Sequence, residues 1–339
     1  MLKSDNTQSQ SIELMHRLFG RTLVDLGKDA DHRLKGIYSP VYDKQEVERF
    51  MSNYYESIEG VQSQVAKIDL TGYYFALLSE AFAKIDFLKG KDSRLSILEL
   101  GCGFGSATFP LLKLLPNADV IASEFSVSML LALKSKLDEE KMAQRCALLQ
   151  LNAEDLDFKP NSFDLITGAA ILHHLFRPEE VIKQSLRILK PRGVAIFFEP
   201  FENGYSILGL IYKSILNDKR AKWLGRKKIE YFRYCIRVWQ KMKTLDKTDS
   251  FFLGQDDKWF FTRQYISNLA EEFGYDKCLI YKLEKSKHPF ETLAKTHLEG
   301  NNIRNIPGWI WDIVKEYEEW FSDNLKEDLL TEGCIILKK

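Results

Sequence analysis

Short apolar runs alternate with helical stretches between residues 95 and 200, and this alternation limits the possible folds more than any other feature. The strand-like runs are LSILEL, DVIASE, CALLQL, FDLITGAA and GVAIFFEP, and helical stretches such as SATFPLLKLL and PEEVIKQSLRIL lie between them. Strands that are apolar on both faces and joined by helices favour a parallel sheet covered on both sides. We therefore predict an α/β fold with a doubly wound sheet.

The segments on either side of this alternating region have a different pattern. Residues 1–93 are predicted to form an N-terminal helical cap, and residues 94–200 the core of the sheet. Residues 201–261 are predicted to be a helical insertion. Residues 262–339 return to the sheet with the runs KCLIYKLE and EGCIILKK, which are separated by a second insertion at 285–331. The predicted sheet has seven strands.

The charge balance argues against a polyanionic partner for the chain as a whole. Of the 339 residues, 48 are Lys or Arg and 48 are Asp or Glu, so the formal net charge is zero. A general attraction to nucleic acid is not indicated by such a balance. The five cysteines are scattered without a CxxC pair, a pattern that predicts neither a disulfide framework nor a metal site.

Targeting and membrane-spanning segments are not expected from the sequence. The first residues, MLKSDNTQSQSIELMHRLFG, lack the apolar core of a signal peptide. The run YSILGLIYKSIL is too short and too interrupted to span a bilayer. We therefore expect a cytoplasmic protein.

Three glycines, Gly101, Gly103 and Gly105, follow the first core strand in SILELGCGFGSAT. A glycine turn at the carboxyl end of a parallel strand lets a ligand approach the main chain, close to the N-terminus of the next helix. A dinucleotide-binding GxGxxG fingerprint would need glycine at position 106, where the chain has Ser106. This departure counts against a nicotinamide cofactor.

Polar residues at the ends of the next two strands indicate a nucleoside ligand. Glu124 lies at the end of the second strand, 19 residues after Gly105, where a carboxylate can accept hydrogen bonds from both ribose hydroxyls. Asn152 follows the third strand, and its amide can pair with an adenine amino group. The backbone N–H of Ala153, the next residue, is expected to face the adenine ring.

Taken together, these motifs resemble those of class I S-adenosylmethionine-dependent methyltransferases. The runs ILELGCGFGSAT, VIASEFSVSML, LNAEDLDF, SFDLITGAAILHHL and LKPRGVAIFFEP correspond in order to motifs of that family. Two positions depart from the family pattern. Asn152 stands where relatives usually have Asp, and Arg192 stands where a turn usually has a second glycine. Asn still offers an acceptor, and we expect the change at 192 to affect only a surface turn.

The resemblance implies that the cofactor is S-adenosyl-L-methionine and assigns residues to it. Gly101 and Gly103 would let the turn pass under the methionine part, and Glu124 would hold the ribose. Glu99 would organise the glycine loop or reach the cofactor's amino group through water. The other implied cofactor-binding positions are Cys102, Phe125, Asn152, Ala153 and Ala169. The resemblance also implies the strand order 3-2-1-4-5-7-6, with the last strand antiparallel.

His173 and His174 are the candidate catalytic residues. They follow the fourth strand at the carboxyl end of the sheet, where ligands bind. An imidazole titrates near about pH 6.5 and can accept a proton at neutral pH. A hydroxyl acceptor benefits from such a base, whereas a neutral amine needs only its lone pair. The alternative is that one histidine caps the next helix and the other packs against the cofactor.

Two groups of residues outside the core leave alternatives open. Tyrosines that precede the core form either a lid or ordinary helix packing; they are Tyr38, Tyr42, Tyr54, Tyr55, Tyr73 and Tyr74. The segment 219–243 has ten Lys or Arg and one acid, interleaved with aromatics. Three interpretations of this segment remain open. It is a solvated helix face, or it binds nucleic acid, anionic lipid or an acidic carrier protein, or it packs against the acidic segment 312–332.

We predict a methyltransferase that acts on an O or N atom of a small apolar or aromatic metabolite, such as those of natural product biosynthesis. The two insertions are expected to build the acceptor chamber, and a homodimer is a further expectation. One alternative is methylation of RNA or of a carrier-tethered intermediate through the segment 219–243. Another alternative is a cofactor-binding subunit without catalytic activity.

Overall fold

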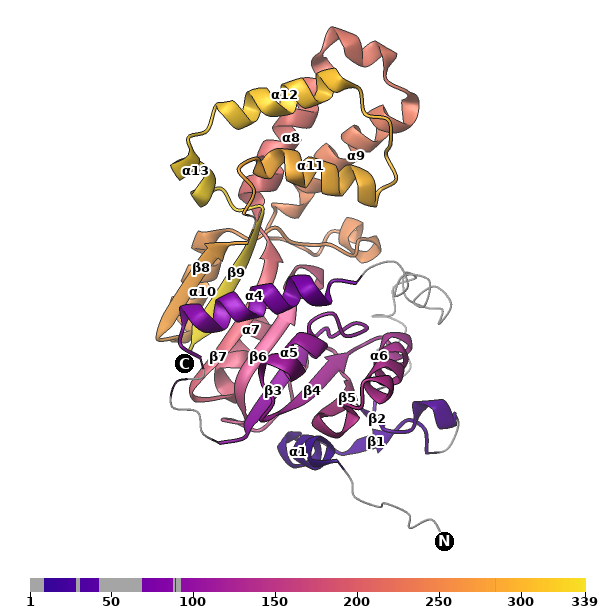
Figure 1. Ribbon diagram of the computed structural model, residues 1–339, viewed down its shortest axis with the longest axis vertical. Coiled ribbons are helices and arrows are strands. Elements are labelled where there is room, and N and C mark those ends of the chain that lie inside the picture. Colours follow the sequence, from indigo (N-terminus) through magenta and orange to yellow (C-terminus); the bar gives the residue numbers. More distant parts are fainter. Residues whose placement is uncertain (1–8, 29–30, 43–68, 88, 90–92, 284) are drawn as a thin grey trace. The chain divides into compact units, whose positions relative to one another are not determined.

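The computed structural model describes residues 9–28, 31–42, 69–87, 89, 93–283 and 285–339, and Figure 1 shows their course. The chain divides into two compact units. The first comprises residues within Met1–Phe197 together with Leu269–Cys278 and Ile336–Lys339, and the second comprises Phe198–Asn268 and Leu279–Ile335. Both predicted insertions, 201–261 and 285–331, fall within the second unit.

A mostly parallel sheet of nine strands has the order β1-β2-β5-β4-β3-β6-β7-β9-β8. The strands are β1 (Leu23–Asp25), β2 (Ile37–Pro40), β3 (Leu95–Leu100), β4 (Ala118–Glu124), β5 (Cys146–Gln150), β6 (Phe163–Ala169), β7 (Leu189–Pro200), β8 (Lys277–Lys282) and β9 (Glu332–Lys338). Strand β3 pairs in parallel with β4 and with β6. The predicted α/β class is confirmed, and strands β3 to β9 have the predicted order 3-2-1-4-5-7-6.

The predicted strand count of seven is wrong, because two short strands come from the region expected to be wholly helical. Strand β2 pairs in parallel with β5 through Ile37 and Tyr38, and β1 pairs antiparallel with β2. These strands have three and four residues. A segment of that length is too short to show a period-two pattern in the sequence.

The last strand runs against its neighbours. The N–H of Arg192 near the start of β7 donates to the carbonyl of Lys339 (2.9 Å), and the N–H of Phe201 after its end donates to Thr331 (3.0 Å). On the other side of β9, the N–H of Leu283 donates to Glu332 (3.1 Å) and that of Asp276 to Lys338 (2.9 Å). The start of each neighbouring strand thus meets the end of β9, as an antiparallel strand requires.

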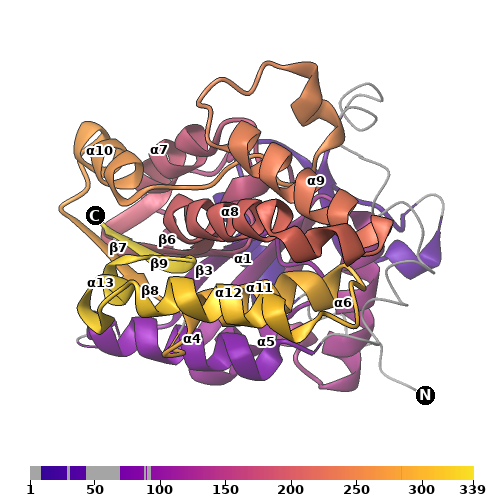
Figure 2. The same cartoon turned by 90° about the horizontal axis from the view of Figure 1, so that it is seen from above.

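Helices cover both faces of the sheet in the first unit. They are α1 (Gln10–Leu18), α4 (Thr71–Lys84), α5 (Thr108–Leu114), α6 (Val127–Glu139) and α7 (Pro178–Ile188). Helices α4 and α5 lie on one face and α7 on the other (Figures 1 and 2). The apolar face of α4 is buried at Leu77, Leu78 and Ala81. Leu77 and Leu78 lie four and three residues before Ala81, so their side chains project from the same side of the helix.

The second unit is built mainly from helices. They are α8 (Glu202–Asn217), α9 (Arg226–Met242), α11 (Pro289–Gly300), α12 (Gly308–Glu319) and α13 (Asp323–Asp328), while α10 (Arg263–Phe273) leads back to the sheet. Helix α8 lies between α9 and α12 (Figure 2). The Tyr212 ring of α8 contacts the rings of Phe232 (4.6 Å between centroids) and Trp239 (5.5 Å) of α9. Among the described helices, none has the length and hydropathy required to cross a bilayer.

Arg192 belongs to β7 rather than to the surface turn expected from the sequence, and its backbone conformation yields a stability prediction. Exposed Arg192 has a φ of 66°, in the left-handed region that costs a non-glycine residue about 1 kcal/mol or more. We expect Arg192→Gly to raise the free energy of unfolding by about 0.5–1 kcal/mol, measured by urea denaturation.

The adjacent glycine provides the matched control. A Cβ at Gly193 would lie 2.8 Å from the carbonyl oxygen of Lys190 and 3.1 Å from that of Phe163. Gly193→Ala should therefore destabilise the protein by more than about 1 kcal/mol, because backbone atoms must move. If Arg192→Gly lowered the free energy of unfolding as much as Gly193→Ala does, the assignment of strain to Arg192 would be contradicted.

Candidate functional site

The glycine turn between β3 and α5 contains one position that packing does not explain. Gly101 and Gly103 both have left-handed backbones, with φ of 64° and 53°. A Cβ at Gly101 would come within 2.8 Å of the Ile171 side chain, whereas the nearest atom to a Cβ at Gly103 is the Met129 Sδ at 3.9 Å. Among the described residues, none fills the space beside the main chain at Gly103, where a ligand can approach it.

The carboxylate of Glu124 holds this turn to the end of β4. Its Oε2 accepts the N–H of Gly103 (3.1 Å) and its Oε1 accepts the N–H of Ser126 (3.0 Å). Burial raises the pKa of Glu124, and these backbone donors act in the opposite direction. Each carboxylate oxygen retains acceptor capacity for a second donor, such as a hydroxyl group.

Glu99, in β3, is a buried acid with an unused acceptor. Its side chain is 2% exposed, and its Oε2 has no hydrogen-bond partner among the described residues. Burial raises the pKa of Glu99 to about 8; the Glu124 carboxylate adds to the rise, while the Thr108 hydroxyl opposes it. A buried acceptor without a partner is costly, so this atom is suited to meet a donor or a cation from a ligand.

The loop after β5 brings Asn152 next to a residue of the N-terminal segment. The N–H of Asn152 donates to the hydroxyl of Tyr42 (3.0 Å), and the Tyr42 ring meets Phe125 edge-on at 5.8 Å. The Asn152 Oδ1 already accepts the N–H of Glu154 (3.0 Å), which leaves it one lone pair. Ala153 is buried beside it. Tyr42 thus contacts two of the predicted adenine-binding residues.

The other tyrosines named in the lid hypothesis have varied surroundings. The Tyr38 ring meets His16 (4.8 Å), and Tyr73 meets Tyr74 (5.3 Å). Tyr54 and Tyr55 lie outside the described residues. Tyr42 is thus a described tyrosine of this set that contacts predicted cofactor-binding residues, namely Asn152 and Phe125.

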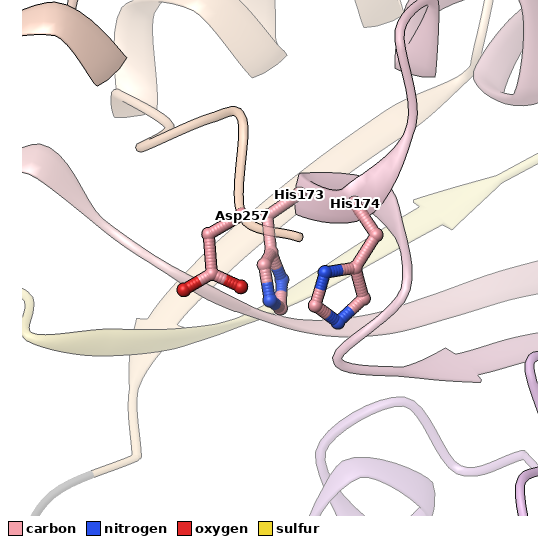
Figure 3. Close-up of side chains that lie close together, drawn as sticks. All are labelled: His173, His174 and Asp257. Atoms are coloured by element: carbon pink, nitrogen blue, oxygen red, sulfur yellow. The ribbon is translucent and has the colours of Figure 1, made fainter. Parts of the chain in front are cut away.

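The two candidate catalytic histidines lie side by side after β6. They belong to the short helix η3 (Leu172–His174), with ring centroids 4.0 Å apart and ring planes at 47° (Figure 3). His173 is 8% exposed, and His174 is half-buried. Ala170, just after the predicted cofactor residue Ala169, has a φ of 55°, a strained value for a residue with a Cβ. Figure 3 also draws Asp257, which belongs to the second unit.

Glu154 belongs to the candidate site, although its place in the sequence does not indicate it. Its Oε1 accepts the N–H groups of Phe176 (2.7 Å) and Arg177 (2.9 Å). Its side chain thereby holds the segment after the histidines and the N-terminus of α7 to the loop after β5. The only signal in the sequence is an acid two residues after Asn152, which by itself does not indicate this contact.

Cys102 lies in the glycine turn but does not have the surroundings of a nucleophile. It is 4% exposed, and burial raises the pKa of its thiol well above the ordinary value. A reactive cysteine needs a lowered pKa and some exposure. We infer that Cys102 has a packing role, and its backbone carbonyl accepts the N–H of Gly105 (2.9 Å) to close the turn.

Comparison with known families identifies the central part of the chain. Residues 98–195 match the family model described as a methyltransferase domain. This part of the chain is a methyltransferase domain by that match. This stretch includes the glycine turn, Glu124, Asn152 and the histidine pair.

Curated relatives of the methyltransferase domain are methyltransferases by name. The chain is 30% identical over 171 residues to the ubiquinone/menaquinone biosynthesis C-methyltransferase UbiE of Pseudomonas aeruginosa (strain LESB58), covering 47% of this chain and 64% of that protein. It is 34% identical over 153 residues to the demethylmenaquinone methyltransferase of Lactococcus lactis subsp. lactis, covering 40% of this chain and 60% of that protein. The match spans less than two thirds of the length of each relative.

The chain is also similar to a solved structure. The phosphoethanolamine N-methyltransferase 2 of Haemonchus contortus, in complex with phosphomonomethylethanolamine and S-adenosylhomocysteine, has a TM-score of 0.49 and is 13% identical. The similarity covers 88% of this chain and 61% of that chain.

The cofactor implied by the methyltransferase domain is S-adenosylmethionine, and the glycine turn with its two neighbouring strand ends fits it in three respects. The open space at Gly103 accommodates a ligand against the main chain. The unpartnered Oε2 of Glu99 suits a cationic amino group or a water bound to one. The acceptor capacity left on Glu124 suits ribose hydroxyls, because both of its oxygens can take a further donor.

The raised pKa of Glu99 gives a pH-dependent stability prediction. The Glu99 carboxyl keeps its proton up to about pH 8 in the folded protein but loses it at about pH 4.5 in the unfolded chain. The free energy of unfolding therefore falls as pH rises between these values. We expect the free energy of unfolding of the ligand-free protein to fall by up to about 2 kcal/mol more than that of Glu99→Gln between about pH 5.5 and 7.5.

Urea denaturation of both proteins at the two pH values measures this difference. Glu139→Gln, at an exposed acid on α6, is the matched control and should retain the pH dependence of the unmodified protein. An identical pH dependence for Glu99→Gln and the unmodified protein would show that Glu99 is ionised in the folded state throughout this range.

Proposed function

We propose that this protein transfers a methyl group from S-adenosylmethionine to a small, apolar aromatic molecule that carries a hydroxyl group. The observation that carries the proposal is the open main chain at Gly103, tied through the Glu124 carboxylate to the end of the neighbouring strand. When bound, S-adenosylmethionine supplies an electrophilic methyl group on a positively charged sulfur. The tasks left to the protein are alignment of the acceptor, exclusion of water and removal of a proton.

In this proposal each part of the site has a separate task. Glu124 accepts the ribose hydroxyls, and Asn152 with the N–H of Ala153 positions the adenine against Phe125. Glu99 interacts with the amino group at the other end of the cofactor. Glu154 keeps the segment after the histidines in place through the N–H groups of Phe176 and Arg177.

The histidine pair is proposed to remove a proton from the acceptor. Loss of the hydroxyl proton raises the electron density on the oxygen and also on the adjacent ring carbon, so one base serves either position. The O or N acceptor expected from the sequence remains a prediction. The curated relatives, which are named as C-methyltransferases in ubiquinone and menaquinone biosynthesis, favour a ring carbon and a quinol-like acceptor. In that case the methyl group replaces a ring hydrogen, which leaves as a proton.

The alternatives are less well supported. The hypothesis that RNA or a carrier-tethered intermediate is methylated depends on the charge of the segment 219–243. The hypothesis of a non-catalytic subunit depends on no specific residue. The relatives named for small quinone-type molecules favour a small acceptor over both. We therefore retain the small-molecule methyltransferase as the proposal.

The cofactor site is tested at Gly103 with Gly274 as its control. Both glycines have positive φ, 53° and 87°, and a Cβ at either would come no closer than 3.9 Å to any neighbouring atom of the part of the chain that the structure describes. Gly103→Leu and Gly274→Leu therefore share the same backbone strain, while only the first fills the proposed cofactor space. In calorimetry with S-adenosylhomocysteine, we expect the first variant to lose at least about tenfold in affinity, or about 1.4 kcal/mol, and the second to lose little.

Circular dichroism should confirm that both variants are folded. Cofactor affinities reduced to the same extent in Gly103→Leu and Gly274→Leu would mean that strain, rather than occupied space, is responsible. Undiminished affinity in folded Gly103→Leu would remove the cofactor from this turn.

The role of the histidines is tested through the pH dependence of methyl transfer. We expect substitution of the catalytic histidine, His173→Gln or His174→Gln, to lower kcat by about 10²–10⁴-fold and to remove the rise in rate between about pH 5.5 and 7.5. Affinity for S-adenosylhomocysteine should change little. Retention of the full rate and pH profile by both variants would indicate an acceptor that needs no base, such as a neutral amine.

A further inference from the structure

Helix α9 presents a continuous basic face to solvent. Its exposed side chains recur at intervals of three, four and seven residues, so they share one side of the helix. The basic members of this face are Arg226, Lys227, Arg233, Arg237 and Lys241, and Glu230 is the acid among them. The opposite side is buried through Phe232, Cys235, Val238, Trp239 and Met242. Figure 2 shows α9 at the edge of the helices of the second unit.

Contacts within the second unit account for only part of this charge. Arg226 pairs with Glu230 and Lys241 pairs with Asp249, but both pairs are exposed and therefore weak. Lys227 donates to the carbonyl of Asn302 (3.1 Å), which adds no negative charge. Near the acidic segment 312–332, Arg220 of η4 (Lys219–Trp223) lies over the ring of Trp309 at 4.7 Å and interacts with the charge of Asp312. A surplus of positive charge remains on the outer face of α9.

Large apolar side chains are exposed along the same segment. Trp223, three residues before the start of α9, is 81% exposed, and Leu245, three residues after its end, is 70% exposed. Tyr234, on the basic face itself, is 45% exposed. The ammonium group of Lys222 lies 5.3 Å from the centre of the Trp223 ring. Exposed tryptophan beside lysine is typical of the boundary between water and lipid, where an apolar ring and a charged group are both accommodated.

We propose that the segment from Trp223 through the exposed basic face of α9 to Leu245 docks on an anionic lipid membrane. Lys and Arg side chains near such a surface are attracted to its negative charge, and the flanking Trp and Leu side chains insert among the lipids. The aliphatic Leu245 has no role in stacking against nucleotide bases, which favours lipid over RNA. The chain as a whole has no net charge, so the attraction is confined to this face.

This inference extends the proposed function, because an apolar acceptor concentrates in membranes. Docking through α9 would hold the enzyme where such an acceptor is most abundant. The docking requires neither the cofactor nor catalysis. It can therefore be tested without either, and its failure can be distinguished from failure of the methyltransferase proposal.

The test is co-sedimentation of the full chain with vesicles. One set of vesicles is phosphatidylcholine alone, and the other contains phosphatidylglycerol as about one third of the lipid. We expect binding to the anionic vesicles that weakens at high salt, and little binding to the neutral ones. Arg233→Gln/Arg237→Gln removes two charges and should lower the partition coefficient by about thirtyfold. Adding Trp223→Ala to this arginine variant should lower the partition coefficient further. The binding that remains should still weaken as the salt concentration rises.

Lys113→Gln/Lys183→Gln, at two exposed lysines on α5 and α7 of the first unit, is the matched control and should bind as the unmodified protein does. Circular dichroism and binding of S-adenosylhomocysteine check each variant separately. The proposal is overturned by equal binding to both kinds of vesicle, by loss of binding in the control to the same extent as in the arginine variant, or by tighter binding to a single-stranded RNA than to anionic vesicles.

Discussion

The carboxylate of Glu124 joins the two strand ends on which the candidate site depends. Strands β3 and β4 are parallel and in register through Leu100 and Ser123, so their carboxyl ends meet. Beyond this point the chain turns away from the sheet twice, and Glu124 accepts one backbone N–H from each turn, Gly103 and Ser126. Charge-assisted hydrogen bonds of this kind are stronger than neutral ones, so they fix the glycine turn at a defined distance from β4. In the proposed function, the same carboxylate accepts hydrogen bonds from the ribose hydroxyls.

A second acid, Glu99, differs from Glu124 chiefly in its hydrogen-bond donors. Burial raises the pKa of both side chains, but two backbone N–H groups favour the ionised form of Glu124, whereas Glu99 has an oxygen that no described residue meets. The ligand-free site therefore tends to keep one charge rather than two, which limits repulsion between the carboxyls. In the proposed complex, the cationic amino group of the cofactor restores the ionised form of Glu99. Binding then releases a proton near neutral pH.

Much of the central fold could be predicted because its signals are local. The strand runs at 95–100 and 118–124 are mostly apolar and almost wholly buried, glycines follow the first at short spacing, and an acid ends the second. The short strands β1 and β2 could not be predicted, because β2 is defined by its pairing with β5 and β1 by its pairing with β2, and three or four residues show no period. The contacts of Tyr42 with Asn152 and of Glu154 with Phe176 also escaped prediction, since each joins residues far apart in the sequence. Such pairs become apparent only when the sheet has brought the loops together.

Two non-glycine residues with left-handed backbones show how the same strain can have different meanings. Arg192 lies at an exposed position near the start of β7, where a glycine would be more favourable. Ala170 has nearly the same conformation, but it lies between β6 and the helix that carries His173 and His174. Strain that persists beside functional groups is maintained by the surrounding structure. Here Glu154 holds the far side of the same segment through Phe176 and Arg177, so the histidines lie between a strained residue and an anchored one. Their positions are consequently set by the backbone, before any ligand binds.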